Sequence, residues 1–214
     1  MLPEAKLIAF DTSAAHCAAA LLLGDSIISR VDDMAKGQAE HLLPMLEEML
    51  AAEGLNWRDL DGIGVGTGPG NFTGIRISVS AARGLALGLG KPAIGVPLLE
   101  AQAFGLDGIV VSCLDARRDM VYAQVFGAGD SVPQLCALDD FPAVPTGARI
   151  VGPVADRIGA VTGLATATTP QPPINAIARM AAMRLGGEHP RPTPLYIRAA
   201  DAAPARDAAP LILP

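Results

Sequence analysis

The sequence predicts an α/β protein in which mixed β-sheets are flanked by helices. Short apolar runs typical of strands alternate with helical stretches along the chain. Half of the residues are hydrophobic and only 4% are aromatic, which predicts an aliphatic core. The 23 glycines and 18 prolines indicate many tight turns, because the hydrophobic content is too high for disorder. A chain of 214 residues can bury a full core as one large domain or two subdomains.

Strands are predicted where a short apolar run lies between turn residues. A polar turn separates the first two runs and Gly24-Asp25 separates the second from the third, so the chain opens with a meander. A later run returns like a hairpin after a charged turn. The predicted strands span residues 7–10, 17–23, 26–31, 62–66, 92–96, 109–114, 120–126 and 195–198.

An amphipathic helix is predicted over Gln38 to Glu53, with Gly54 as its stop. Pro44 has no backbone N–H, so the helix either begins close to this residue or bends there. Apolar side chains recur at helical spacing on one side of this stretch. They are Leu42, Met45, Leu46, Met49 and Leu50.

A second long helix follows the glycine-rich loop at 67–74 and ends near Gly90, with Thr73 as its expected N-cap. Small residues line this helix, and they lower its intrinsic stability unless another backbone approaches closely. We therefore expect a tight helix–helix contact along it. The small residues are Gly74, Ser78, Ala81, Ala82, Gly84 and Gly88.

The remaining chain is predicted with less structure. Helices are expected at 98–104 and 174–185, prolines interrupt the pattern beyond residue 127, and no internal repeat is detected. We expect a first subdomain at 1–105, a reduced second subdomain at 106–200, and a mobile Ala/Pro-rich tail at 201–214.

Charge and cysteine content restrict the function and the compartment. The net charge of −6 has the wrong sign for a protein that holds a polyanion alone, so nucleic acid would require another subunit. The three cysteines lie far apart, which excludes a disulfide framework and favours a reducing cytoplasm. No secretion signal and no apolar run of the ~20 residues that a membrane span requires is found.

Two segments could handle phosphate. The turn at Asp11 could present hydroxyls and amides while the aspartate orients a metal-bound water, or it could simply satisfy its own amides. The loop Gly68–Gly74 precedes a helix start carrying Arg76, where free amides attract anions; the alternative is a tight corner with Arg76 in an ion pair. The loop matches neither a P-loop nor the dinucleotide fingerprint. The candidate residues of a degenerate nucleotide site are Asp11, Thr12, Ser13, Gly68, Gly70 and Arg76.

No catalytic or metal-binding residue is predicted. The three histidines lie too far apart in sequence for a paired-helix metal site, and His41, at the head of the helix where Glu40 could pair with it, is expected to have a capping or surface role. No serine or cysteine lies in a nucleophile motif. The charged turn Asp115–Asp119 is either solvated and self-paired or a contact for an anion or a partner.

Five segments, in this order and spacing, resemble the bacterial TsaB family, also called YeaZ. They lie at 7–13, 38–44, 68–76, 115–117 and 194–198, and the resemblance that they carry extends over most of the chain. The resemblance implies an actin-like fold, shared with sugar kinases and Hsp70, with two subdomains. It also implies a role in making N6-threonylcarbamoyladenosine in tRNA. In this family the protein is a non-catalytic subunit that binds and activates the metal-dependent subunit TsaD, with the ATPase TsaE as third member.

The resemblance further implies that tRNA is reached only through this complex, and that the chain forms a homodimer when alone. It implies no cofactor of the chain's own and places ATP or ADP at the interface of the complex. TsaD holds its metal through histidines on a helix, whereas His41 is single here. Asp115 matches the second phosphate turn but is followed by Ala-Arg-Arg instead of glycines, so independent nucleotide binding is not expected.

Docking is expected through the helices that begin near His41 and Gly74. Two alternatives remain: a free-standing ATPase or small-molecule kinase with Asp11 orienting a metal, and a glycoprotease, which would carry zinc. The residues expected at the partner-helix interface are Leu42, Met45, Leu46, Met49, Gly74, Ser78, Ala81, Ala82 and Leu85.

Overall fold

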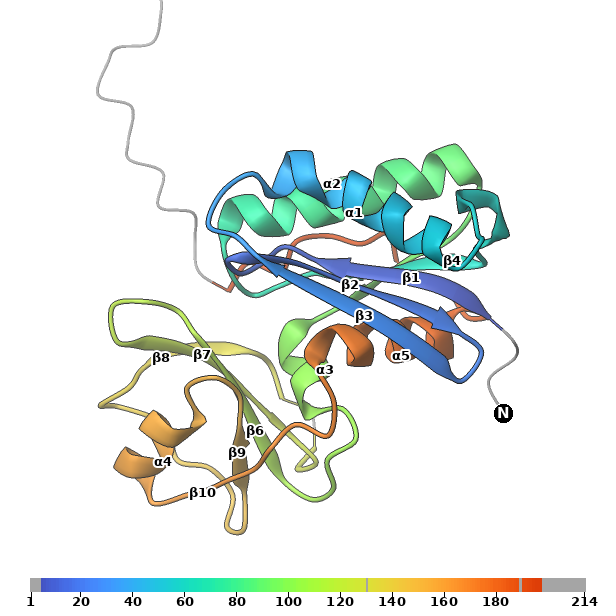
Figure 1. The fold of residues 1–214 in the computed structure, drawn as a ribbon. Coiled ribbons are helices and arrows are strands. Elements are labelled where there is room, and N and C mark those ends of the chain that lie inside the picture. The colour runs from blue at the N-terminus through green and yellow to red at the C-terminus, as the bar shows by residue number, and fades with distance from the viewer. Residues whose placement is uncertain (1–4, 130, 189, 198–214) are drawn as a thin grey trace, which may run out of the picture.

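The computed structural model describes residues 5–129, 131–188 and 190–197 and contains two mixed five-stranded sheets (Figure 1). The first has the order β3-β2-β1-β4-β5 and the second the order β10-β9-β6-β7-β8. The strands of the first sheet are β1 (Lys6–Asp11), β2 (His16–Leu23), β3 (Ser26–Asp33), β4 (Gly62–Gly66) and β5 (Ala93–Val96). Those of the second are β6 (Val110–Asp115), β7 (Met120–Phe126), β8 (Gln134–Ala137), β9 (Arg149–Val151) and β10 (Ala165–Thr166).

The two sheets repeat one topology. In each, the first three strands form an antiparallel meander, the fourth pairs parallel with the first, and the fifth pairs parallel with the fourth. The search for sequence repeats missed this duplication because connectivity, not residue identity, is repeated. The expectation of an actin-like fold built from two mixed sheets is confirmed.

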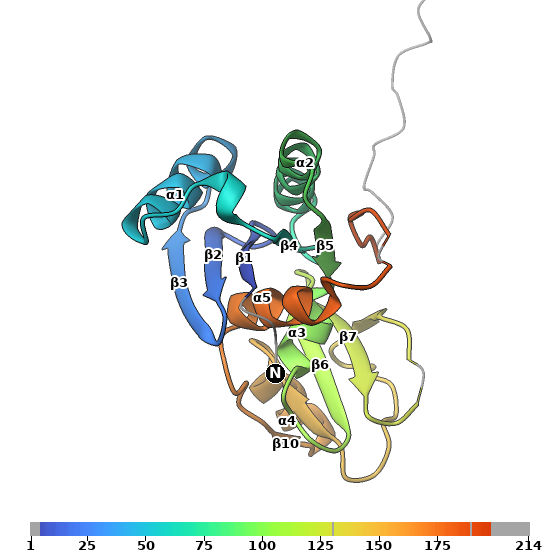
Figure 2. The same cartoon turned by 90° about the vertical axis from the view of Figure 1, so that its right-hand side faces the viewer.

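Helices cover both faces of the first sheet. The helices α1 (Gln38–Ala52) and α2 (Phe72–Leu89) lie side by side on one face, and α5 (Pro173–Arg184) lies on the other (Figure 2). The short α3 (Leu98–Ala103) packs between α5 and β6, and α4 (Ala155–Thr162) packs on β9. A 3-10 turn, η1 (Trp57–Asp59), precedes β4.

The central strand β1 shows how this packing follows from the sequence. Successive side chains of a strand point to opposite faces. Ile8 and Phe10 therefore join the core beneath α1 and α2, while Leu7 and Ala9 join the core beneath α5. All four are fully buried, as expected for a strand covered by helices on both sides.

One helix packs far from its neighbours in the sequence. Although α5 follows the second sheet in sequence, it packs against β1, β4 and β2 of the first.

The predicted division at residues 105 and 106 stays a prediction, and the tail at 201–214 lies outside the described residues. Within the described residues, no helix has both the length and the apolar character that crossing a membrane requires.

The structure corrects two local predictions, the N-cap of α2 and the last strand, and it resolves the position of Pro44. Asn71, not Thr73, caps α2, because its side-chain oxygen accepts a hydrogen bond from the Gly74 amide at 2.9 Å. Pro44 lies inside α1, which begins six residues earlier at Gln38. The strand predicted at 195–198 is wrong: residues 195–197 form no strand, and residue 198 lies outside the described part. One hydrogen bond, from the Leu195 amide to the Thr67 carbonyl, holds this segment to the first sheet.

Candidate functional site

The turn after β1 is built around a buried carboxylate. Asp11 is 3% exposed, and its Oδ2 accepts hydrogen bonds from the Ser13 amide at 3.2 Å and the Ser13 hydroxyl at 2.8 Å. The ring nitrogen Nε2 of His16 lies 3.2 Å from the same oxygen. The other oxygen, Oδ1, is buried and has no hydrogen-bond partner among the described residues. The turn thus satisfies its own amide and hydroxyl, as one of the two interpretations of this motif predicted.

The glycine-rich loop closes directly onto this turn. The Thr12 hydroxyl donates to the Gly74 carbonyl at 2.7 Å, and the Asn71 amide donates to the Ser13 carbonyl at 2.7 Å. A Cβ atom at Gly70 would lie 2.5 Å from the Ser13 carbonyl oxygen, and one at Gly74 would collide with the Thr12 carbonyl oxygen. These glycines are therefore required by close contact between two backbone segments.

Two of the six predicted nucleotide-site residues lie elsewhere. Gly68 has a φ of 92° and accepts a hydrogen bond from the Leu98 amide. Arg76 forms no ion pair with any residue in the described ranges; its guanidinium lies 3.7 Å from the centre of the Phe72 ring, and its Nε donates to the Tyr196 hydroxyl at 2.8 Å. The ion pair that one of the two interpretations of this loop gave to Arg76 is therefore not found among the described residues. The structure brings together Asp11, Thr12, Ser13 and Gly70.

Phe72 and Tyr196 are site residues that the sequence analysis missed. Their ring centres lie 4.8 Å apart, so this contact fastens the segment at 190–197 to the first turn of α2. Phe72 and Arg76 are four residues apart in a helix, which is a spacing that brings side chains together. Tyr196 carries no comparable sequence pattern, because it is 120 residues from Arg76.

The pKa of His16 is raised above its ordinary value. The main cause is the hydrogen bond with Asp11, and the negative charges of Asp11 and Asp33 add to it, while partial burial opposes it. Because the folded protein holds the imidazolium more tightly than the unfolded chain does, protonation of His16 stabilises the fold.

We therefore expect a pH-dependent contribution from His16 to the free energy of unfolding. The contribution is fully present below the unfolded pKa of 6.5 and is lost as the pH rises through the higher folded value. Urea unfolding at several pH values should show this loss in the wild type and a flatter profile in His16→Gln. Equal pH profiles for both proteins would contradict the assigned pair.

The turn after β6 repeats the geometry of the first with different residues. Asp115 Oδ1 accepts the Arg117 amide at 3.0 Å, as Asp11 accepts the amide two residues on. Arg117, Arg118 and Asp119 have φ values of 63°, 52° and 55°, a left-handed conformation that costs a non-glycine residue about 1–2 kcal/mol. Asp119 pairs with Arg157 at 2.9 Å. The second turn therefore presents two arginines on a backbone that would suit glycines better.

The residues predicted at the partner interface are mostly in the protein's own core. Four apolar residues of α1 and Ala82 of α2 are buried between these helices and the first sheet. Ser78 is also buried, and Gly74 lies under Thr12. Ala81 and Leu85 remain partly exposed. Helical spacing shows that one face is apolar, but it does not tell whether a sheet or a partner covers that face. The four residues of α1 are Leu42, Met45, Leu46 and Met49.

A different set of residues forms the outer surface of α2. Residues spaced by four, three and four positions lie along one side of a helix. Ile77, Ala81, Gly84 and Gly88 have this spacing, and we call the last three of them the small-residue stripe. Gly84 and Gly88 are exposed, and a Cβ atom at either position would meet nothing within 4 Å. On α1, the large apolar side chain of Leu43 is 41% exposed.

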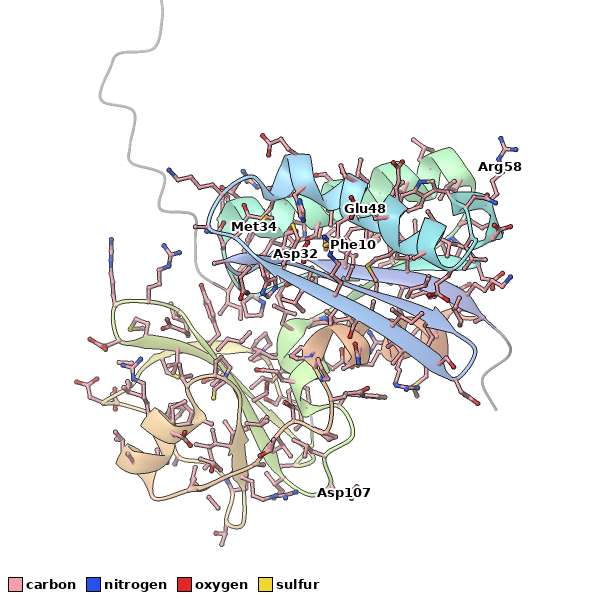
Figure 3. All side chains as sticks on the ribbon, viewed as in Figure 1. Phe10, Asp32, Met34, Glu48, Arg58 and Asp107 are labelled. Carbon is pink, nitrogen blue, oxygen red and sulfur yellow. The ribbon has the colours of Figure 1, made fainter. Side chains whose placement is uncertain are left out.

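Asp32 on the edge strand β3 and Glu48 on α1, both labelled in Figure 3, belong to an ion-pair network that joins the two elements. Asp32 accepts from Arg30 at 2.7 Å and lies 2.7 Å from His41 Nε2, while Arg30 also pairs with Glu48 at 2.7 Å. The pKa of Asp32 is lowered, first by Arg30 and then by His41. His41 therefore pairs with Asp32 on β3 rather than with its neighbour Glu40.

The cysteines are poor nucleophiles. Burial raises the pKa of Cys17 to about 11 and that of Cys113 to about 12, so both thiols stay protonated at neutral pH. Within the part of the chain that the structure describes, no group of three histidine, cysteine, aspartate or glutamate side chains could hold a metal ion.

Comparison with known proteins shows clear relatives. Residues 32–199 match the family model described as "TsaD: tRNA N6-adenosine threonylcarbamoyltransferase". The "tRNA threonylcarbamoyladenosine biosynthesis protein TsaB" of Escherichia coli is 34% identical over 55% of this chain and 53% of its own length. An uncharacterized protein of Mycobacterium tuberculosis is 31% identical over 92% of this chain and 94% of its own length.

A solved structure shows the same architecture. "YeaZ from Pseudomonas aeruginosa" is 26% identical, with a TM-score of 0.71, over 90% of this chain and 99% of the other. The chain therefore matches YeaZ over nearly its full length, but spans only about half the length of the E. coli relative that it matches.

Proposed function

This chain belongs to the TsaB (YeaZ) family, and from that premise we propose that it is an accessory subunit in the synthesis of N6-threonylcarbamoyladenosine in tRNA. In this role it docks through α1 and α2 onto a catalytic subunit of the TsaD type. It reaches tRNA through that subunit and carries out no transfer chemistry alone. The same surface pairs two copies of this chain when the catalytic subunit is missing.

The observation that carries the proposal is the small-residue stripe. Glycine in the middle of a helix lowers the free energy of unfolding by about 0.5–1 kcal/mol relative to alanine. Solvent-exposed glycines within a helix therefore need an explanation. Gly74 has one within the chain, since a side chain there would strike Thr12. Gly84 and Gly88 have open space above them. A partner helix that approaches closely would account for both residues.

The phosphate turn also supports an accessory role. The hydroxyls of Thr12 and Ser13 donate to groups within the chain, and Arg76 stacks on an aromatic ring. In the second turn, arginines stand where a phosphate loop of this fold would use small residues. The side chains of the first turn are therefore already engaged within the chain, whereas an independent ATPase would need them free to face a nucleotide. The arginines of the second turn are too large for that role.

A reconstituted reaction tests the proposed function. The chain, a TsaD-type subunit from the same organism and the remaining components are combined with tRNA, and threonylcarbamoylated adenosine is measured by mass spectrometry. We expect modification to depend on adding this chain, and we expect the chain alone to show no turnover of Mg-ATP. Mg-ATP turnover by the isolated chain that disappears in Asp11→Ala would instead favour a free-standing ATPase.

A further inference from the structure

A surface pocket of about 600 Å3 lies where α2 meets the start of β5 and the segment at 190–192. Arg83 and Arg191 both line it, and its apolar lining is formed mainly by Ala86, Leu87 and Pro92. Its volume is in the range of small-molecule sites, roughly 300–1,000 Å3. Gly84 borders both this pocket and the small-residue stripe, but the two arginines belong to the pocket only.

The pocket lies in a cationic part of an acidic protein. The chain carries a net charge of −6, yet residues 62–99 contain no aspartate or glutamate. Three cations, Arg76, Arg83 and Lys91, fall within that same stretch. The neighbouring helix α1, in contrast, carries Glu40, Glu47 and Glu48.

The two pocket arginines have no acidic partner. Arg30 and Arg184 are each held by a carboxylate, Arg184 by Glu100. In contrast, neither Arg83 nor Arg191 forms an ion pair with any residue in the described ranges, and both are exposed. Two arginines, each with a planar guanidinium that donates several N–H groups, therefore line one pocket without a carboxylate partner among the described residues.

We propose that this pocket binds a phosphate group. Guanidinium donors match the oxygens of phosphate, and two of them favour a group that can carry more than one negative charge over a single carboxylate. The side chain of Leu87 is 84% exposed beside them, so it offers an apolar surface to the remainder of the ligand. The phosphate belongs either to a free nucleotide or to an RNA backbone. The pocket borders the helical surface of the proposed function at Gly84, but phosphate binding by its arginines does not require that function.

The test compares ligand binding by variants of the full chain. The probes are fluorescently labelled ADP and a labelled RNA hairpin, titrated at low and moderate salt. The double variant Arg83→Gln, Arg191→Gln removes both cations, and Leu87→Glu places a carboxylate at an exposed pocket position. Arg58→Gln is the matched control, since Arg58 is exposed on η1 and does not line the pocket (Figure 3).

We expect the wild type and Arg58→Gln to bind a probe equally, and the double variant to bind it about tenfold or more weakly. Leu87→Glu should weaken binding in the same direction. Loss of ADP binding identifies a nucleotide as the source of the phosphate, and loss confined to the hairpin identifies RNA. The proposal is overturned if neither probe binds the wild type, or if the double variant and Arg58→Gln bind alike. Circular dichroism confirms that each variant is folded.

Discussion

Replacing Gly74 by alanine is expected to lower the free energy of unfolding by roughly 3 kcal/mol, because the added methyl group would collide with the Thr12 carbonyl oxygen. The obstacle is backbone rather than a flexible side chain, so it cannot move aside without breaking the turn. The Thr12 hydroxyl donates to the Gly74 carbonyl at this same point. Relief of the clash would therefore also separate the glycine-rich loop from the turn at Asp11.

Gly84→Ala is the matched control on the same helix. Its added methyl group meets open space, so alanine should raise the free energy of unfolding by about 0.5–1 kcal/mol through helix propensity alone. Urea unfolding of the two variants should give shifts of opposite sign. Shifts of the same sign would show that the contact between the loop and the turn does not hold the start of α2 as described.

The second large effect is expected from Gly88→Arg. Gly88 is exposed with open space around it, and arginine suits a helix better than glycine does, so the variant should fold normally. A long side chain would, however, keep a partner helix from approaching the small-residue stripe. Threonylcarbamoylation of tRNA in the reconstituted reaction should therefore fall to the level measured without this chain. Gly186→Arg makes the same change at another exposed, open glycine, beyond the end of α5, and should leave the reaction unchanged.

Strong local periodicity of apolar residues made most of the first sheet and its helices predictable. The strands β1 to β7 and the helices α1 to α3 were predicted from apolar runs and helical spacing, including the apolar face of α1, whereas the 3-10 turn η1 was missed. In the second sheet, β8, β9 and β10 were missed. They are only two to four residues long, which is too short to show an alternation of apolar and polar residues. Their pairing with β7 and β6 is a tertiary feature that no local pattern carries.

The site was predictable in its residues but not in its contacts. Glycine spacing located the loop that closes on Asp11, yet the sequence could not tell whether those glycines leave room for a phosphate or for another backbone segment. The structure shows backbone at Gly70 and Gly74. Arg76 was placed near the turn by its position at the start of a helix, but the Phe72 ring and the hydroxyl of Tyr196, 120 residues away, hold it. Apolar residues of α1 were assigned to a partner because burial by a sheet produces the same spacing.

Direct titration of the TsaD-type subunit into this chain tests most sharply whether α1 and α2 form the docking surface. Calorimetry should give the same dissociation constant for the wild type and Gly186→Arg, and one at least about 30-fold weaker for Gly88→Arg, as for loss of a central interface contact. If Gly88→Arg binds as tightly as the wild type, the partner does not approach this helical face, and the accessory role assigned to it would be wrong.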